Sequence, residues 1–384
     1  MEMLVPLADL DFGEGESQAV LEVLNSRWLT MGAVTQEFES QFAEMAGVKH
    51  ALAVSNGTAA LHLACLVLGI GPGDEVILPS LTFVATANAV LYTGAEVRFA
   101  DIIGPQELNI SPDSILKQIT PRTKALILMH YGGYPCRMPE ILEIADRYNL
   151  ALIEDAAHAP GARLEGRALG TWGDVGCFSF FSNKNLATGE GGMLVTQRDD
   201  LAERARLLRS HGMTSLTWDR YKGHAYSYDV VDLGYNYRID EMRSALGLVQ
   251  LSKLDKNNKR RKDITQTYWG ALHGSRLGLP FREYAAQPVN SGSYHIFPVL
   301  LPEGVRRKDF MDSLRLAGIQ TSIHYPPIHQ FSYHRQFVSG VALPRTERVA
   351  EREVTLPLYS SMSDSQVDLV LRAVKVALEQ ARSS

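Results

Sequence analysis

One lysine stands out in the sequence because of its surroundings. Lys184 lies within residues 177–193, CFSFFSNKNLATGEGGM, between an apolar run and a cluster of glycines at 189, 191 and 192. The apolar run predicts a buried strand over residues 175–180, and the glycines let the chain turn tightly. An amine that burial partly desolvates loses its proton more readily and can form a Schiff base. The pattern indicates either a reactive amine or a solvated loop lysine, and the local residues do not decide between them.

A short polar turn after another apolar run predicts a binding site for an anion. Residues 51–54 have the length of a strand, Ser55-Asn56-Gly57-Thr58 follows, and an apolar helix is expected to run through residue 68. The free N–H groups and the positive end of such a helix point at the turn. The pattern is equally typical of a plain turn between strand and helix, with Thr58 near the N-cap.

A third polar cluster follows a further predicted strand. Residues 151–153 are apolar and lead into Glu154-Asp155-Ala156-Ala157-His158. An open α/β sheet places its ligands at the carboxyl ends of its strands. Asp155 is therefore either an acid that faces a ligand or a helix cap. His158 is either a ligand contact or a polar neighbour of the core.

Together these three clusters suit pyridoxal phosphate (PLP). Its phosphate needs helix N–H groups and hydroxyls, its ring nitrogen needs a carboxylate such as Asp155, and its aldehyde needs an amine such as that of Lys184. Phe83 could stack on the ring face. The clusters predict PLP as the cofactor. No metal is expected, because the cysteines lack the spacing of metal ligands.

The elements that must position these residues alternate between strand and helix. Further strands are expected at 75–78, 96–100, 125–129 and 193–196, and further helices at 17–25, 36–45, 112–119, 139–148 and 201–208. This alternation predicts an α/β fold with a mostly parallel sheet covered on both faces. The long aromatic and polar stretch 211–232 predicts a functional loop or hairpin.

A change of composition after about residue 255 predicts a second domain. The expected division is a large domain of residues 1–255 and a smaller α+β domain of residues 256–384. A helix that begins near residue 239 is expected to continue through the basic segment 256–262, which would be a solvated face. Strands are predicted at 294–301 and 320–324, and helices at 308–316 and 363–380.

The overall composition argues against several classes of protein. The 384 residues are 45% hydrophobic and 21% charged, and the net charge of −5 gives no support for a nucleic-acid surface. Cys65, Cys136 and Cys177 are odd in number and far apart, which argues against a disulfide framework. The N-terminus lacks a signal pattern, and no apolar stretch is long enough to span a membrane. We therefore expect a cytoplasmic protein.

The motifs, taken in order, resemble those of the DegT/DnrJ/EryC1/StrS family of PLP-dependent aminotransferases, which mostly act on nucleotide-linked keto sugars. The resemblance covers nearly the whole chain. Its motifs are SNGTAAL at 55–61, TFVAT at 82–86, EDAAH at 154–158, FSF at 178–180 with Lys184, GEGG at 189–192 and GYNYR at 234–238. Each is weak alone, but all of them in this order are highly specific. The resemblance implies the type I aminotransferase fold, with a mainly parallel seven-stranded sheet in the large domain.

The resemblance also implies roles around the cofactor ring. Lys184 would hold PLP as a Schiff base, Asp155 would pair with the pyridinium nitrogen, and Phe83 would cover one face of the ring. His158 stands where many relatives have glutamine, near the ring hydroxyl. Histidine occurs there in other relatives, so the same role is expected.

A second set of roles concerns the phosphate. Thr58, the Ala59 backbone N–H and Ser179 would hold it, with Gly57 in the same cofactor-binding turn. Asn236 would reach it from the neighbouring subunit. The resemblance therefore implies a homodimer in which each active site is built from both chains.

The expected reaction is amino transfer in two halves. An amino acid, by resemblance L-glutamate, would give its amino group to the cofactor, and a keto group on a nucleotide-linked deoxysugar would then receive it. The alternatives are an aminotransferase for a cyclitol or another ketone, a PLP-dependent sugar dehydratase, and a non-catalytic regulatory protein of the same fold. Relatives that are dehydratases carry histidine in place of the lysine, so Lys184 favours amino transfer.

The substrate contacts are expected in two segments. Residues 323–329, IHYPPIH, match a segment that lines the active site in relatives, so His324, Tyr325 and His329 are candidate contacts. A structural aromatic–proline turn would explain the same residues. Arg238 could meet a substrate anion in the partner's site, or could pair with Asp240 or Glu241. Residues 28–32 are expected to close over the sugar.

Overall fold

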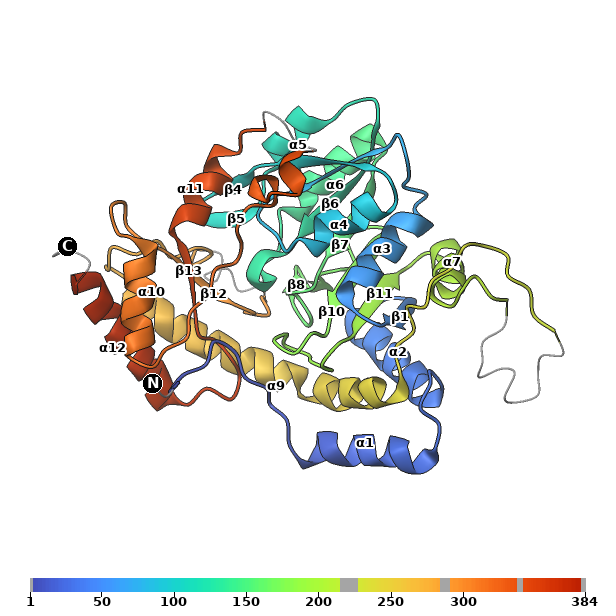
Figure 1. The fold of residues 1–384 in the computed structure, drawn as a ribbon, viewed down its shortest axis with the longest axis horizontal. Coiled ribbons are helices and arrows are strands. Elements are labelled where there is room, and N and C mark those ends of the chain that lie inside the picture. The colour runs from blue at the N-terminus through green and yellow to red at the C-terminus, as the bar shows by residue number, and fades with distance from the viewer. Residues whose placement is uncertain (1–2, 215–226, 284–290, 337–340, 381–384) are drawn as a thin grey trace.

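A seven-stranded sheet forms the centre of the computed structural model, which describes residues 3–214, 227–283, 291–336 and 341–380 (Figure 1). The strand order is β1-β11-β10-β7-β6-β2-β3, and only β11 runs antiparallel to its neighbours. The mainly parallel sheet predicted from the sequence is confirmed. In chain order its strands are β1 (His50–Val54), β2 (Glu75–Pro79), β3 (Glu96–Ala100), β6 (Thr123–Met129), β7 (Ala151–Asp155), β10 (Val175–Ser179) and β11 (Gly192–Thr196).

Helices cover both faces of this sheet because its strands are apolar on both faces. Leu52 and Val54 of β1 pack in one core with helices α3 (Gly57–Val67), α4 (Ala85–Tyr92) and α7 (Asp199–Arg209). Ala51 and Ala53 pack in the other core with helices α2 (Ala33–Ala46), α5 (Pro112–Gln118) and α6 (Met138–Tyr148). Successive residues of a strand thus belong to opposite cores, as the two-residue period of a strand requires.

A 32-residue helix, α9 (Glu241–Leu272), joins the two ends of the molecule. Figure 1 shows it running from beside α1 (Glu14–Ser26) and α2 to α12 (Asp364–Gln380) at the other end. Residue 255 lies inside this helix. The division into domains at that residue stays a prediction.

The C-terminal part has a two-stranded antiparallel sheet of β12 (Phe297–Leu300) and β13 (Glu353–Leu356), with helices α10 (Arg307–Leu316) and α11 (Pro344–Arg352). Its core also takes in Leu81, Met129 and Tyr131 from the first part of the chain. The carboxyl edge of the large sheet is therefore in direct contact with the C-terminal part. The remaining short elements are β4 (Ile102–Gly104), β5 (Glu107–Ile110), η1 (Tyr131–Gly133), β8 (Arg163–Leu164), β9 (Arg167–Ala168), η3 (Ile328–Gln330) and η4 (His334–Gln336).

The strand predicted at 320–324 is wrong: of these residues only Ser322 pairs with β13, through a bridge to Thr355, while the preceding Ile319 bridges to Val5. The stretch 211–232 lies partly outside the described residues, since 215–226 are not described. Its flanks pair as a hairpin would, through an antiparallel bridge between Met213 and Val230. Within the described part of the chain, no helix is both long and apolar enough to cross a membrane.

Candidate active site

A pocket of about 840 Å³ lies where the parallel strands end. The polar clusters predicted from the sequence converge there because β1, β2, β7 and β10 all point the same way. Ten of the predicted site residues line it: Gly57, Thr58, Ala59, Phe83, Asp155, His158, Ser179, Lys184, His324 and Tyr325. The other three, Asn236, Arg238 and His329, do not.

Asp155 is the last residue of β7 and stands in register between Met129 of β6 and Cys177 of β10. Its carboxylate accepts hydrogen bonds from the Thr86 hydroxyl (2.7 Å) and the Ala157 N–H (3.2 Å). No helix follows it, so it is not a helix cap. Burial raises its pKa above the usual value, while these two hydrogen bonds oppose the shift. The structure therefore places a buried acid at the floor of the pocket.

Lys184 lies in the loop after β10 and faces the same pocket. Burial of its amine lowers its pKa to about 8, and the charge of Asp155 only partly opposes this. The next residue anchors the loop, because the Asn185 amide donates to Asn258 Oδ1 (2.7 Å) and to the Ser293 carbonyl (2.6 Å). These features fit a reactive amine and not a solvated loop lysine.

The N-terminus of α3 forms the opposite side of the pocket. Its N-cap is Asn56, two residues before Thr58, and the Asn56 side chain accepts the Ala59 N–H at 2.9 Å. The Ala59 N–H is thus already bonded within the chain. The N–H groups of Gly57 and Thr58 precede the first helical hydrogen bond and are the ones that a phosphate could use.

Gly57 also brings α3 close to β10. A Cβ atom at Gly57 would lie 2.8 Å from the Cβ of Ser179, which is closer than real side chains approach. The Ser179 side chain is therefore held against the helix N-terminus. This arrangement gathers backbone N–H groups and a hydroxyl, which is the chemistry that a phosphate monoester requires.

Aromatic side chains form the wall between α4 and the C-terminal part. The Phe83 ring is 55% exposed, although it lines the pocket, and its centroid lies 5.9 Å from that of Tyr325. The Tyr325 hydroxyl lies 2.9 Å from His158 Nε2, and the Gly132 N–H donates to His158 Nδ1 at 3.3 Å. Nε2 therefore carries the ring proton and donates to Tyr325. Burial holds the pKa of His158 well below its usual value, so the ring is neutral.

The predicted substrate residues divide into two groups. His324 lines the pocket and its Nδ1 lies 2.8 Å from the Thr355 hydroxyl. His329 lies outside, where its ring bonds to Ser80 (2.7 Å) and Glu347 (3.1 Å) and so ties β2 to α11. Of the segment 323–329, the first half fits a binding role and the second half fits the structural turn.

The segment around Asn236 and Arg238 lies beside the pocket but does not line it. The Asn236 residue is exposed, and the Arg238 backbone bridges to Val54. Between them Tyr237 does line the pocket and bonds to His62 at 3.0 Å. Residues 28–32 do not line the pocket either, and Thr30 among them bridges to residue 240.

Sequence reasoning missed several residues of the site. Asn56 could have been found, because an asparagine directly before a predicted helix is an N-cap signal, and its side chain typically accepts the N–H three residues later. Thr86 could not, because its bond to Asp155 joins residues 69 positions apart. The same holds for Tyr237 and Asn183, which line the pocket only through the tertiary fold.

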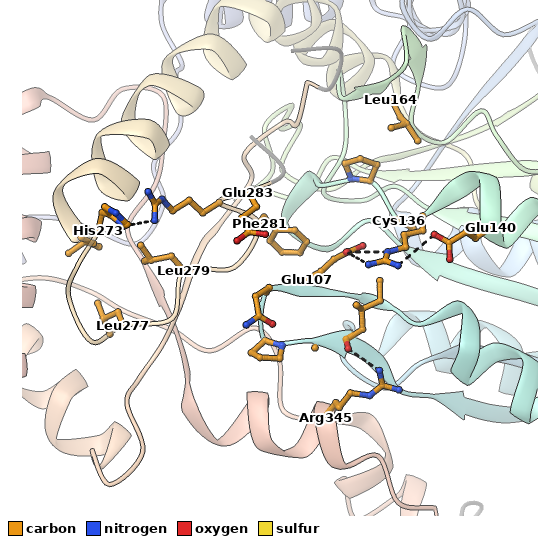
Figure 2. A pocket seen from close by; sticks show the side chains of 18 of the residues that line it. Glu107, Cys136, Glu140, Leu164, His273, Leu277, Leu279, Phe281, Glu283 and Arg345 are labelled. Atoms are coloured by element: carbon orange, nitrogen blue, oxygen red, sulfur yellow. Dashed lines mark hydrogen bonds and ion pairs between the residues drawn. The ribbon is translucent and has the colours of Figure 1, made fainter. Parts of the chain in front are cut away.

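A second cavity of about 860 Å³ lies away from this site, between the β4–β5 hairpin and the end of α9 (Figure 2). Three of its charged residues form one cluster: Arg137 pairs with Glu107 at 3.2 Å and with Glu140 at 3.6 Å. Burial raises the pKa of the Cys136 thiol well above its usual value, which makes the thiol inert. The described residues that line this cavity offer no reactive amine.

The residues of the first pocket fit PLP. They supply a buried amine, a buried carboxylate, a helix N-terminus with a neighbouring hydroxyl, and an aromatic face. No carboxylate among the described residues forms an ion pair with Lys184, so its amine is available for a carbonyl group. The donor set and its grouping thus meet each chemical need of the cofactor.

Comparisons with known proteins agree with this geometry. Residues 11–375 match the model of the DegT/DnrJ/EryC1/StrS aminotransferase family. The spore coat polysaccharide biosynthesis protein SpsC of Bacillus subtilis is 42% identical over 371 residues, which make up 94% of this chain and 94% of SpsC.

Solved structures are similar over almost the full length. The aminotransferase TlmJ of Streptoalloteichus hindustanus has a TM-score of 0.91 and 36% identity, over 99% of this chain and all (100%) of TlmJ. Spr1654 of Streptococcus pneumoniae, solved in its PLP form, has a TM-score of 0.89 and 27% identity, over 98% of this chain and 99% of its own. The chain therefore belongs to the DegT/DnrJ/EryC1/StrS family and is a PLP-dependent aminotransferase.

Proposed function

We propose that this aminotransferase moves an amino group from L-glutamate to the keto group of a nucleotide-linked deoxysugar. The observation that carries the proposal is that one pocket of about 840 Å³ is lined by both the desolvated amine of Lys184 and the buried acid Asp155. A pocket of that volume is in the range of small-molecule sites and must hold the cofactor together with the group that receives the amine.

The residues divide the work of amino transfer between them. When bound, PLP supplies an electron sink for the carbon that loses a proton. Lys184 would hold the cofactor, and its free amine, of lowered pKa, would accept and release the proton that is moved in amino transfer. A pKa of about 8 suits this task, because the amine exchanges protons readily near neutral pH. Asp155 stabilises positive charge on the ring nitrogen.

Other residues bind and orient. The N–H groups of Gly57 and Thr58 and the Ser179 hydroxyl are proposed to hold the phosphate, while Phe83 covers one ring face. The neutral His158, which donates to Tyr325, is proposed to lie at the ring hydroxyl. Asn236 is proposed to reach the phosphate of a second copy of the chain, since in this copy it is exposed and outside the pocket.

The sugar substrate is supported by the relatives. SpsC is named for polysaccharide biosynthesis, and it is 42% identical over 94% of this chain. Lys184 also opposes the dehydratase alternative, in which histidine takes its place. A cyclitol ketone would use the same site chemistry and is the outcome that the experiment must separate.

The test is a product assay by mass spectrometry. The holoenzyme is incubated with L-glutamate and, in separate reactions, with each of a panel of nucleotide-linked keto deoxysugars and with a cyclitol ketone, and both the aminated product and 2-oxoglutarate are measured. We expect the two products in equal amounts, none with Lys184→Ala, and unchanged yield with Lys117→Ala, which removes an exposed lysine. A deoxygenated sugar without an amino group, or amination of a cyclitol ketone only, would contradict the proposal.

A further inference from the structure

A buried carboxyl group lies directly behind the wall of the active-site pocket. Glu353, the first residue of β13, is 1% exposed and forms no ion pair with any described residue. Its Oε2 accepts the backbone N–H of His324 at 2.8 Å, and its Oε1 lies 2.5 Å from the Thr355 hydroxyl. A buried carboxyl without a cation tends to keep its proton.

The Thr355 hydroxyl continues this chain of hydrogen bonds to the pocket. Its oxygen lies 2.8 Å from His324 Nδ1, so the hydroxyl stands between the Glu353 carboxyl and the His324 ring. His324 lines the active-site pocket. Because Nδ1 is turned toward Thr355, Nε2 is the ring nitrogen left for a ligand.

We propose that Glu353 sets, through the Thr355 hydroxyl, which nitrogen of His324 carries the ring proton, and thereby whether the pocket is offered a hydrogen-bond donor or a bare acceptor. A hydroxyl has one proton, so it can donate in only one direction. With a protonated Glu353, the carboxyl donates to Thr355, Thr355 donates to Nδ1, and Nε2–H is the donor. With an ionised Glu353, Thr355 donates to the carboxylate and accepts from Nδ1–H, and Nε2 is an acceptor.

The two states differ by one proton, and the balance is simple. The Glu353 proton moves to the Thr355 oxygen, the Thr355 proton moves to Nδ1, and the Nε2 proton leaves to water or to a ligand group in the pocket. No group is oxidised or reduced. Glu353 is thus a positioning residue that acts on the substrates only through His324.

The charged and titratable groups around this relay set the pH at which it changes state. The Arg307 guanidinium of α10 donates to the Glu353 backbone carbonyl (3.4 Å) and not to its carboxylate, while Tyr131 of η1 donates to the His324 carbonyl. Tyr131 and Tyr325 lie near the Glu353 carboxyl. Burial raises the pKa of Glu353 to about 8, and the Arg307 charge opposes this only weakly.

The groups around the ring keep His324 itself neutral. Burial and the Lys184 charge lower the pKa of His324 to about 4, and the two other rings nearby, His158 and His295, are also held neutral by burial. Near pH 7 the relay is therefore in the state with Nε2–H. That state suits an oxygen acceptor on the substrate, such as a carboxylate or a sugar hydroxyl.

The inference rests on the proposed function only in that the pocket receives these substrates. The test reads the ring directly and so is independent of activity. The holoenzyme is prepared with histidine labelled with a nitrogen isotope that NMR detects, and His324→Gln identifies the resonances of that ring. In the wild type we expect the Nε2–H tautomer one to two pH units below the pKa of about 8 and the Nδ1–H tautomer above it.

Two variants separate this relay from a merely structural contact. Glu353→Gln can accept the His324 N–H with its oxygen and donate to Thr355 with its nitrogen, so it should fix the Nε2–H tautomer at every pH. Thr355→Val should abolish the pH dependence, and Thr355→Ser should restore it. If Glu353→Gln fails to fold, the comparison of Thr355→Val with Thr355→Ser tests the relay. A His324 tautomer that ignores pH in the wild type, or follows it equally in Thr355→Val, would overturn the proposal.

Discussion

Lys184 shows how burial turns an ordinary residue into a reactive one. Its pKa falls from 10.5 to about 8 because the pocket desolvates the ammonium form. The unfolded chain therefore binds more protons than the folded one between those two values, and this group makes the protein more stable as pH rises through that window. Below about pH 8 both states are protonated, and the folded state bears the full cost of the buried charge.

The same pKa predicts how the apoenzyme captures its cofactor. Only the neutral amine attacks an aldehyde, so the rate of PLP binding at Lys184 should rise about tenfold per pH unit below pH 8 and level off above it. Stopped-flow absorbance with PLP measures this rate. A free lysine analogue serves as the control, and its rate should still rise at pH 9. A capture rate that climbs in parallel with the analogue would contradict the lowered pKa.

Asp155 predicts a loss of catalysis without a loss of folding. Asp155→Asn keeps an oxygen for the Thr86 hydroxyl, which is 2.7 Å away, but removes the negative charge. We expect kcat to fall about 100-fold or more, since electrostatic stabilisers in closed sites contribute that much. The thermal unfolding temperature should fall only modestly, because the new amide NH2 cannot accept the Ala157 N–H (3.2 Å) but the cost of burying a charged carboxylate is removed. The exposed Asp113→Asn is the matched control; equal activities of the two variants would remove Asp155 from the reaction.

At the scale of elements, the sequence predicts where the site lies better than how it is built. Apolar runs ending at Val54, Asp155 and Ser179 mark strand ends, and parallel strands bring these ends to one edge. Contacts across the fold leave no local signal. The hydrogen bond between Thr86 and Asp155 and the one between Thr355 and His324 are examples, because each joins residues far apart in the chain.

The strand β13 shows the same limit for secondary structure. The segment 353–356 is only four residues long and begins with a glutamate, so its pattern does not distinguish a strand from a loop. They become a strand because β12 pairs with them, with Phe297 opposite Leu356. Conversely, residues 320–324 look like a strand but have only one bridge to it, at Ser322.

The close approach of α3 to β10 at Gly57 predicts that a larger residue there weakens PLP binding. Gly57→Ala would place a methyl group 2.8 Å from the Cβ of Ser179 and push the helix N-terminus away from the strand end. We expect PLP to bind about tenfold more weakly, which corresponds to about 1.4 kcal/mol. Equilibrium dialysis of the apoprotein measures this. The control is Gly13→Ala, whose added methyl meets nothing within 4 Å and which should bind PLP like the wild type. Wild-type PLP affinity in Gly57→Ala as well would show that the close approach of α3 to β10 does not matter for binding.

For the whole molecule, the main question is whether one chain alone forms a complete active site. The pocket is lined by described residues of one copy, yet Asn236 is exposed outside it. A few residues earlier in the chain, Val230, Val231 and Leu233 are 57%, 56% and 80% exposed. Exposed apolar side chains that form a patch commonly mark an interface. The homodimer with shared sites, like the division of the chain at residue 255, stays a prediction.

Mixed dimers test the shared site directly. Lys184→Ala and Asn236→Ala are each expected to lose activity, the second by about tenfold through one lost hydrogen bond to an anion. If Asn236 serves the partner's pocket, co-refolding the two variants restores one intact site per mixed dimer, and activity should recover well above either variant alone. Mixtures that only average the two parents would show that Asn236 acts within its own chain or not at all.

Lys184 is proposed to hold PLP, and L-glutamate is proposed to convert the cofactor in the first half of amino transfer. The most direct measurement is the visible absorbance of the purified protein before and after L-glutamate, with Lys184→Ala and Lys117→Ala alongside. We expect a yellow band that L-glutamate bleaches in the wild type and in Lys117→Ala, with no such response in Lys184→Ala. A band that L-glutamate leaves unchanged, or one that Lys184→Ala bleaches at the wild-type rate, would contradict this assignment.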